Sequence, residues 1–187
     1  KIISGGHFHG QPMAFAGDFL GIVVAELANI SERRIDRLLN PLINETKPFL
    51  SVDPGVNSGL MIIQYTAASL VSENKILAHP ASVDSIPTSA YQEDHVSMGT
   101  IAARKAGKIL EHTAQVLAIE WLSAAQAYEF VAPLKLGKGS AAAYELLREH
   151  VPALGEDRIL APDLRIARDL LWDSRLLDHV SKAVEIV

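Results

Sequence analysis

Apolar residues recur every three or four positions over several long stretches of the chain, which is the spacing of one face of an α-helix. The first stretch predicts a long helix from about residue 12 to 40, with Pro12 in a first turn that tolerates proline. Its apolar positions are Phe15, Phe19, Ile22, Val23, Leu27 and Ile30.

Two further long helices are predicted over residues 57–72 and from 94 to about 130. The 57–72 segment is apolar or small nearly all round, which predicts burial on every face and more packing partners than this chain alone supplies. Residues 75–93, with Pro80, Pro87 and several serines, predict an extended loop before the next helix. The apolar stripe of that helix includes Ile109, Val116, Leu117, Ile119, Leu122 and Ala125.

Glycine and proline breaks divide the rest of the chain into shorter helices near residues 140–149, 163–172 and 175–185. Alternation typical of strands is nearly absent. The sequence therefore predicts an all-α fold, a bundle of long helices. We expect two parts: residues 1–132 as the central long-helix segment with the active-site loops, and residues 133–187 as a smaller helical tail.

Composition limits the classes of function. With 187 residues, 49% of them hydrophobic and 21% charged, the chain can bury a sizeable core. The net charge of -5 and the lack of a Lys/Arg block argue against a protein that binds nucleic acid or a membrane surface by charge. A small molecule or another protein is the expected partner.

The chain contains no cysteine, so it has no disulfide, thiolate metal site or cysteine nucleophile, which suits a cytoplasmic protein. Its first residues lack the apolar run of a signal peptide, and we expect no uninterrupted apolar stretch that could span a bilayer. No methionine opens the chain, which suggests a fragment, a processed product or one half of a divided protein.

Glu93 is the first candidate for chemistry. It lies between Gln92 and Asp94, where the third long helix is predicted to begin. There the helix dipole, burial and neighbouring charge could tune its ionisation. Such a carboxylate could bind an ammonium or imidazole group, or act as acid or base in an elimination. The alternative is that Glu93 and Asp94 are simply acidic residues favoured in a first helical turn.

The segment His7-Phe8-His9 follows two glycines and offers two kinds of chemistry. The two histidines could ligate a metal, but no carboxylate or thiolate stands at a supporting spacing, so ordinary loop histidines are the better interpretation. We predict no metal site. Phe8 could form an aromatic wall for a flat substrate, or it could be an ordinary core residue.

A hydrolytic triad of Ser89, Asp94 and His95 is disfavoured. Asp94 and His95 are neighbours on a predicted helix, so their side chains point in different directions.

Three segments resemble the histidine ammonia-lyase family. They are SGGHFHGQPMAFAGDFL, ELANISERRIDRLLNP and SENKILAHPASVDSIPTSAYQEDHVSMGTIAAR. The resemblance is close over residues 1 to about 130 and looser in the tail. It implies a C-terminal portion with the all-α fold of the ammonia-lyase/fumarase-like superfamily. It also implies a homotetramer whose long helices bundle across subunits and whose active sites combine residues from several chains.

The family acts in histidine catabolism, converting L-histidine to urocanate and ammonia with an electrophilic methylidene-imidazolone formed from an internal Ala-Ser-Gly. By resemblance, Glu93 matches the essential active-site glutamate and Phe8 a substrate-pocket aromatic. The pair Gln92-Glu93 favours histidine as substrate, because relatives specific for phenylalanine or tyrosine tend to lack that glutamate.

Two positions beside these residues depart from the family pattern. His7 and Tyr91 each replace an asparagine, which puts a ring where the family has a small amide and changes pocket volume and hydrogen bonding. We count both among the substrate-binding candidates. They keep open a tyrosine or phenylalanine ammonia-lyase and a 2,3-aminomutase.

The chain contains no Ala-Ser-Gly. In the family this tripeptide, a catalytic tyrosine and a carboxylate-binding arginine lie in the N-terminal portion. We therefore expect the chain to be inactive alone and to act only with an N-terminal portion of the same enzyme. A non-catalytic helical remnant is the remaining alternative.

Overall fold

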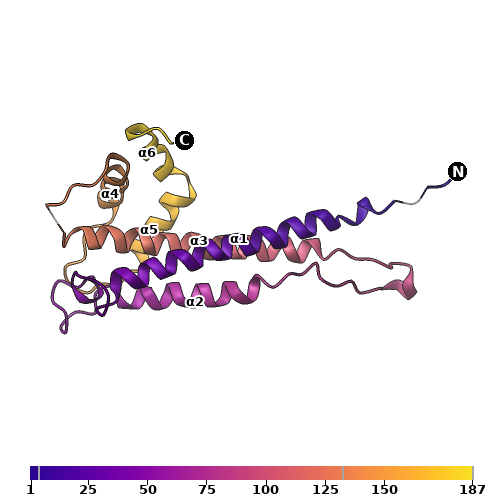
Figure 1. The fold of residues 1–187 in the computed structure, drawn as a ribbon, viewed down its shortest axis with the longest axis horizontal. Coiled ribbons are helices and arrows are strands. Elements are labelled where there is room, and N and C mark those ends of the chain that lie inside the picture. Colours follow the sequence, from indigo (N-terminus) through magenta and orange to yellow (C-terminus); the bar gives the residue numbers. More distant parts are fainter. Residues whose placement is uncertain (4, 132, 187) are drawn as a thin grey trace. The chain divides into compact units, whose positions relative to one another are not determined.

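The computed structural model describes residues 1–3, 5–131 and 133–186. Over these residues the chain forms six α-helices and three short 3-10 turns, with no β-strand, so the predicted all-α fold is confirmed (Figure 1). The helices are α1 (Gln11–Leu39), α2 (Met61–Leu77), α3 (Gly99–Tyr128), α4 (Lys138–His150), α5 (Ala161–Trp172) and α6 (Arg175–Ala183). The 3-10 turns are His7–His9, Pro48–Leu50 and Ser89–Tyr91.

The predicted helix bounds hold to within about two residues, except at both ends of α2 and at the start of α3. Helix α2 begins at Met61 rather than 57 because Gly59 adopts a left-handed φ of 60°, which a continuing helix does not allow. Helix α3 begins at Gly99 rather than 94 because Met98 adopts a left-handed φ of 57°. The stretch before each helix is therefore loop.

The chain forms two compact units, each assembled from separate segments. One unit comprises Lys1–Ala28 and Val71–Thr113, and the other comprises Asn29–Leu70 and Ala114–Val187. Each long helix thus contributes one part to each unit. The predicted division at residues 132/133 follows the order of the chain and remains a prediction.

In the first unit, α1 and α3 pack through small residues. A Cβ atom built on Gly17 would lie 3.3 Å from Cβ of Ala102, and one built on Gly21 would lie 3.2 Å from Cδ1 of Ile109. Ala102 and Ile109 are fully buried. The close approach of the two helices therefore depends on glycine at these two positions of α1.

The buried face of α1 is not the apolar stripe from which the helix was predicted. Up to residue 28 the buried positions are small or polar instead, among them Ala14, Asp18 and Ala28, whereas Ile35 and Leu39 are fully buried near the end of the helix. The residues of that stripe are each between 42% and 68% exposed, and they are Phe15, Phe19, Ile22, Val23, Leu27 and Ile30. The prediction of a helix was correct, but close packing selected the face with small side chains.

Helix α2 is only partly covered by this chain. Ile62 is 59% exposed and Tyr65 is 67% exposed, which agrees with the expectation that the helix needs more packing partners than this chain alone supplies.

The helical stretch His7–Leu39 is the one candidate among the described residues that is long and apolar enough to cross a membrane by length and composition. Asp18 and Glu26 interrupt it, so it is not the uninterrupted apolar stretch that the sequence argument excludes.

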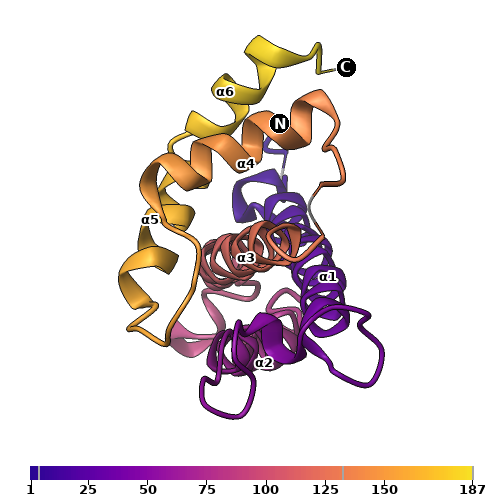
Figure 2. The same cartoon turned by 90° about the vertical axis from the view of Figure 1, so that its left-hand side faces the viewer.

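In the second unit, α4 and α5 lie beside the C-terminal part of α3, and α6 packs against α4 and α5 (Figure 2). A buried apolar cluster joins α3 to α4 and α5, and its members are Ala118, Leu122, Ala125, Leu147, Val151 and Ala167. The packing of the helical tail is therefore mainly hydrophobic.

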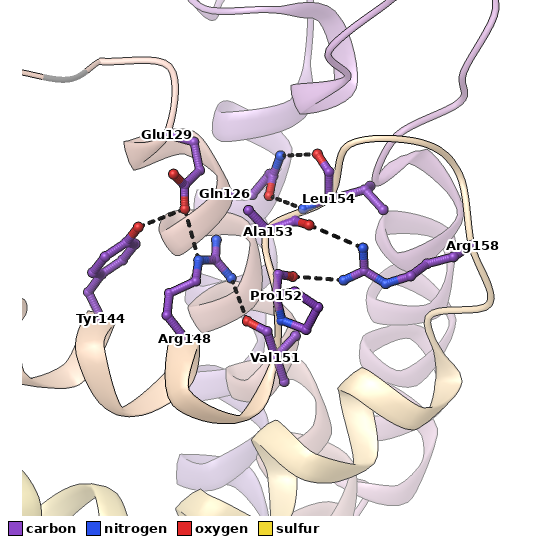
Figure 3. A network of polar contacts seen from close by, with 9 residues as sticks. All are labelled: Gln126, Glu129, Tyr144, Arg148, Val151, Pro152, Ala153, Leu154 and Arg158. Carbon is purple, nitrogen blue, oxygen red and sulfur yellow. Dashed lines mark hydrogen bonds and ion pairs between the residues drawn. The ribbon is translucent and has the colours of Figure 1, made fainter.

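Polar contacts fix the segment after α4 to the end of α3 (Figure 3). The side-chain amide of Gln126 donates to the carbonyl oxygen of Leu154 and accepts from its backbone nitrogen, both at 2.9 Å. Glu129 accepts from the Tyr144 hydroxyl at 2.7 Å and from Arg148 Nε at 2.8 Å. These contacts determine the path of residues 151–154 over α3.

Candidate active site

The segment that carries Glu93 is a loop closed on itself. The backbone nitrogen of Thr88 donates to the carbonyl oxygen of Glu93 at 3.0 Å, and the nitrogen of Glu93 donates back to Thr88 at 3.4 Å. Between them, Ser89, Ala90 and Tyr91 adopt left-handed φ values of 53°, 54° and 67°. Non-glycine residues adopt this conformation only at a cost, and such strain is common at functional sites.

Glu93 therefore does not lie in the first turn of a helix. Helix α3 begins at Gly99, and Gln92 and Glu93 are exposed in the loop before it. The expected position of Glu93 at a helix N-terminus is wrong, because the residue lies in the exposed loop before Gly99. The interpretation of Glu93 as an ordinary first-turn residue is wrong for the same reason.

His7 and Phe8 lie in the 3-10 turn that directly precedes α1. Both are exposed, and Phe8 is 80% exposed, so it is not a core residue of this chain. Its ring stacks on His9 with the ring centroids 4.1 Å apart. One aromatic face of Phe8 is thus open to a ligand.

His95 connects this turn to the loop that carries Glu93. Its ring meets the ring of His9 edge to face, with centroids 4.9 Å apart. Its Nε2 atom lies 3.0 Å from Oε1 of Gln11, at the start of α1. His95 is therefore hydrogen-bonded to an amide and not to Ser89 or Asp94, so these three residues form no triad here. Asp94 and His95 nevertheless lie in the loop before α3 and not on a helix, so the reason given from the sequence was wrong.

A buried carboxylate fixes the beginning of the same loop. Asp18 is 7% exposed and accepts hydrogen bonds from the backbone nitrogens of Ala81 at 2.9 Å and Ser82 at 2.8 Å. Burial raises the pKa of Asp18, but these hydrogen bonds and the charge of Lys105 outweigh burial, so the pKa lies below its usual value. Lys105 also donates to the carbonyl oxygen of His79.

The site candidates thus come from two segments of one unit: His7 and Phe8 before α1, and Tyr91, Gln92 and Glu93 before α3. Their side chains are exposed, and none of the five makes a side-chain hydrogen bond to another residue in the described part of the chain. The two segments meet through the rings of His9 and His95, and no contact joins the candidate side chains of one segment to those of the other among the described residues. A carboxylate, an amide and an aromatic face each suit a small cationic or flat substrate.

Among residues 1–3, 5–131 and 133–186, no group of three or more His, Asp or Glu side chains has the geometry to hold a metal ion.

Sequence reasoning missed Gln11 and Asp18. Asp18 gave a signal, because a carboxylate within an otherwise apolar stretch of helix must find hydrogen-bond donors when it is buried. Gln11 gave none, because its partner His95 lies far along the chain and no spacing rule connects the two.

The chain matches a family model described as aromatic amino acid lyase over residues 1–149. It belongs to this family. Similar sequences and structures include two histidine ammonia-lyases. One, from Alkaliphilus metalliredigens, is 57% identical over 187 residues, which is 100% of this chain and 37% of that protein. The other is the crystal structure of the enzyme from Trypanosoma cruzi, with a TM-score of 0.93 and 47% identity, covering 98% of this chain and 37% of that one.

A tyrosine aminomutase from Streptomyces globisporus is also similar in structure, with a TM-score of 0.95 and 39% identity over 100% of this chain and 36% of that one. The chain therefore spans about a third of the length of the relatives it matches. Its fold is shared by family members that differ in reaction.

Proposed function

We propose that this chain is part of a histidine ammonia-lyase, which eliminates ammonia from L-histidine to give urocanate. The observation that carries the proposal is the higher identity to histidine ammonia-lyases than to the structurally similar tyrosine aminomutase. The pair Gln92-Glu93 supports the same substrate, because a carboxylate and an amide can bind the imidazole or ammonium group of histidine.

In the proposed site, each candidate residue contacts the substrate. The Glu93 carboxylate holds the imidazole or amino group or moves a proton on it, and Gln92 hydrogen-bonds beside it. Phe8 packs on the ring of the substrate. His7 and Tyr91 border the same space and influence which side chain fits.

The electrophile of the family, a methylidene-imidazolone, would supply an electrophilic carbon for the substrate. Its Ala-Ser-Gly precursor does not occur in these 187 residues. The exposed groups of this chain are a carboxylate, an amide and aromatic rings, which suit holding a substrate against such an electrophile. We propose that an N-terminal portion of the enzyme provides it and that this chain alone is inactive.

The exposed apolar faces support a larger assembly. Phe15, Phe19, Ile22 and Val83 line an apolar groove on α1 and the segment after α2. Burying such a surface releases free energy of about 25 cal/mol per Å². We propose that the rest of the enzyme and other subunits cover it in a homotetramer.

The second candidate is a tyrosine or phenylalanine ammonia-lyase or a 2,3-aminomutase on the same scaffold. The observation that favours it is the pair of rings at His7 and Tyr91, together with the structural similarity to tyrosine aminomutase. A non-catalytic helical remnant would fold but support no turnover with any amino acid.

A segment exchange tests these candidates. The part of the Alkaliphilus metalliredigens histidine ammonia-lyase that matches this chain would be replaced by residues 1–187, and the chimera would be supplied with L-histidine, L-tyrosine and L-phenylalanine. We expect urocanate from histidine and no arylacrylate or β-amino acid from the other two. Products from tyrosine or phenylalanine instead would support the second candidate. A chimera of the parental oligomeric state without turnover would contradict both enzyme proposals.

A further inference from the structure

The amide of Gln11 is hydrogen-bonded on both sides, to the two ends of the loop that carries the site. Its Nε2 atom donates to the carbonyl oxygen of Ser82 at 3.3 Å. Its Oε1 atom lies 3.0 Å from Nε2 of His95. Between Ser82 and His95 lie Tyr91, Gln92 and Glu93, so one side chain at the start of α1 closes the loop at its base.

The bond to Ser82 determines which group of Gln11 faces His95. A carbonyl oxygen only accepts, so the NH2 group of Gln11 must face Ser82. The amide oxygen then faces His95, and Nε2 of His95 must carry the proton. In the neutral form of the ring, this arrangement places the proton on Nε2 and leaves Nδ1 as the acceptor.

The same anchor extends to the aromatic candidate. The His95 ring meets the His9 ring edge to face, and the His9 ring stacks on Phe8. Gln11 is therefore connected through His95 to the segment that carries Phe8 and, along the backbone, to the segment that carries Glu93.

Few other side-chain contacts hold the loop. Within it, the Ser85 hydroxyl accepts from the backbone nitrogen of Val96 at 3.0 Å, and Thr88 pairs with Glu93. These bonds join the loop to itself. Asp18 fixes only its beginning, at Ala81 and Ser82. The connection of the second end to α1 is the hydrogen bond between His95 and Gln11.

We propose that Gln11 is a positioning residue: it does not contact the substrate, but its bonds to Ser82 and His95 hold the loop that carries Glu93 against the start of α1. The proposal rests on the proposed function, in which Glu93 acts on the substrate. Displacement of a charged partner by about 1 Å can cost on the order of 100-fold in rate. Loss of the Gln11 bonds should therefore be seen in substrate binding as well as in turnover.

The kinetic test uses the active chimera with Gln11→Leu, which removes both hydrogen bonds at similar volume. Gln115→Leu, the same change at an amide of α3 outside the loop, is the matched control. We expect Gln11→Leu to raise KM and to lower kcat/KM by about tenfold or more, with Gln115→Leu unchanged. Gln11→Glu keeps an acceptor for His95 and should recover part of the loss. An unaltered KM in Gln11→Leu would overturn the proposal, because a purely structural defect lowers only the amount of active enzyme.

A second readout does not depend on turnover. Long-range nitrogen–proton NMR spectra of the 187-residue chain report which ring nitrogen of His95 carries the proton. In the parent chain we expect the form of His95 that is protonated on Nε2. In Gln11→Leu its nitrogen signals should shift or show a mixture with the other tautomer, whereas Gln115→Leu should leave them unchanged. If the chimera turns over no amino acid, the proposed function fails, and the NMR result alone decides whether Gln11 sets the loop. An identical His95 signal in both variants would overturn the inference.

Discussion

The backbone nitrogen of Ser82 donates to the buried carboxylate of Asp18 at 2.8 Å, with the nitrogen of Ala81 beside it at 2.9 Å. Removing the acceptor by Asp18→Ala leaves both donors without it. We expect a loss of about 1–3 kcal/mol in the free energy of unfolding, measured by urea denaturation. The loss should be smaller for Asp18→Asn, which keeps one acceptor oxygen.

Asp84 provides the control, because it is an exposed carboxylate on the same loop. Asp84→Ala should leave the free energy of unfolding within about 0.5 kcal/mol of the parent. Equal losses for the two alanine variants would contradict the assigned role of Asp18. Since the folded pKa of Asp18 is lowered from 3.8, its stabilisation is present above pH 3.8 and lost as the pH falls through the lowered value.

Gly59 stands where no other residue fits. Its φ is 60°, and a Cβ atom there would lie 2.5 Å from the carbonyl oxygen of Phe49, which accepts a hydrogen bond from the nitrogen of Leu60 at 2.9 Å. We expect Gly59→Ala to lower the free energy of unfolding by at least about 2 kcal/mol. Gly107 is exposed within α3 with nothing within 4 Å, so Gly107→Ala should raise it by about 0.5–1 kcal/mol. Thermal unfolding of the two variants checks this contrast, and a change of the same sign in both would contradict it.

His112 gives the stability a dependence on pH. Its ring is buried, with Nδ1 2.9 Å from Oδ1 of Asn74 and Nε2 4.0 Å from Glu73. Burial, the largest effect, lowers its pKa below 6.5; Glu73 and Glu111 oppose this, and Lys108 adds to it. The folded state therefore binds fewer protons than the unfolded chain. Stability from this group is present above pH 6.5 and decreases as the pH falls through the lowered folded value.

The measurement is the free energy of unfolding as a function of pH below 6.5. We expect its slope to flatten in His112→Gln. The same substitution at the exposed His79 tests whether the loss of any histidine has this effect. A slope that flattens equally in both variants would show that burial of His112 is not the cause.

Gln126 satisfies two backbone groups of Leu154 in the interior of the second unit (Figure 3). Gln126→Leu keeps the volume but leaves a buried N–H and C=O unpaired, and we expect a loss of about 2–4 kcal/mol. Glu129→Gln changes the more exposed ion pair with Arg148 nearby and should cost less than about 1 kcal/mol. Denaturation midpoints of the two variants would show the difference, and a larger loss for Glu129→Gln would contradict it.

The helical elements could be predicted from sequence because periodicity and breakers act locally. The face of each helix that packs inward could not be predicted. The stripe with Phe15 and Phe19 predicted α1, yet the side with Gly17 and Gly21 packs against α3. That close approach depends on residues of α3, which the local sequence of α1 does not show. The predicted position of Glu93 in a first helical turn was wrong for a related reason. An acidic pair before an apolar run looks like a first helical turn, and nothing in the sequence shows that Met98 is left-handed.

The candidate site was predicted mostly through resemblance, and the structure adds how its parts are held. Phe8 and Glu93 were found from motifs, whereas the bonds of Gln11 to Ser82 and His95 depend on contacts between distant segments. Such contacts follow from the tertiary fold and leave no local pattern.

The most direct test of the account compares Glu93→Gln with Asp94→Asn in the chimera that contains this chain. Both changes remove one negative charge from neighbouring exposed positions, so a general charge effect would appear in both. We expect Glu93→Gln to lower kcat/KM for L-histidine by about 100-fold or more with no change in oligomeric state, and Asp94→Asn to stay close to the parent. Equal urocanate formation by Glu93→Gln and the parent would contradict the central claim that Glu93 acts on the substrate.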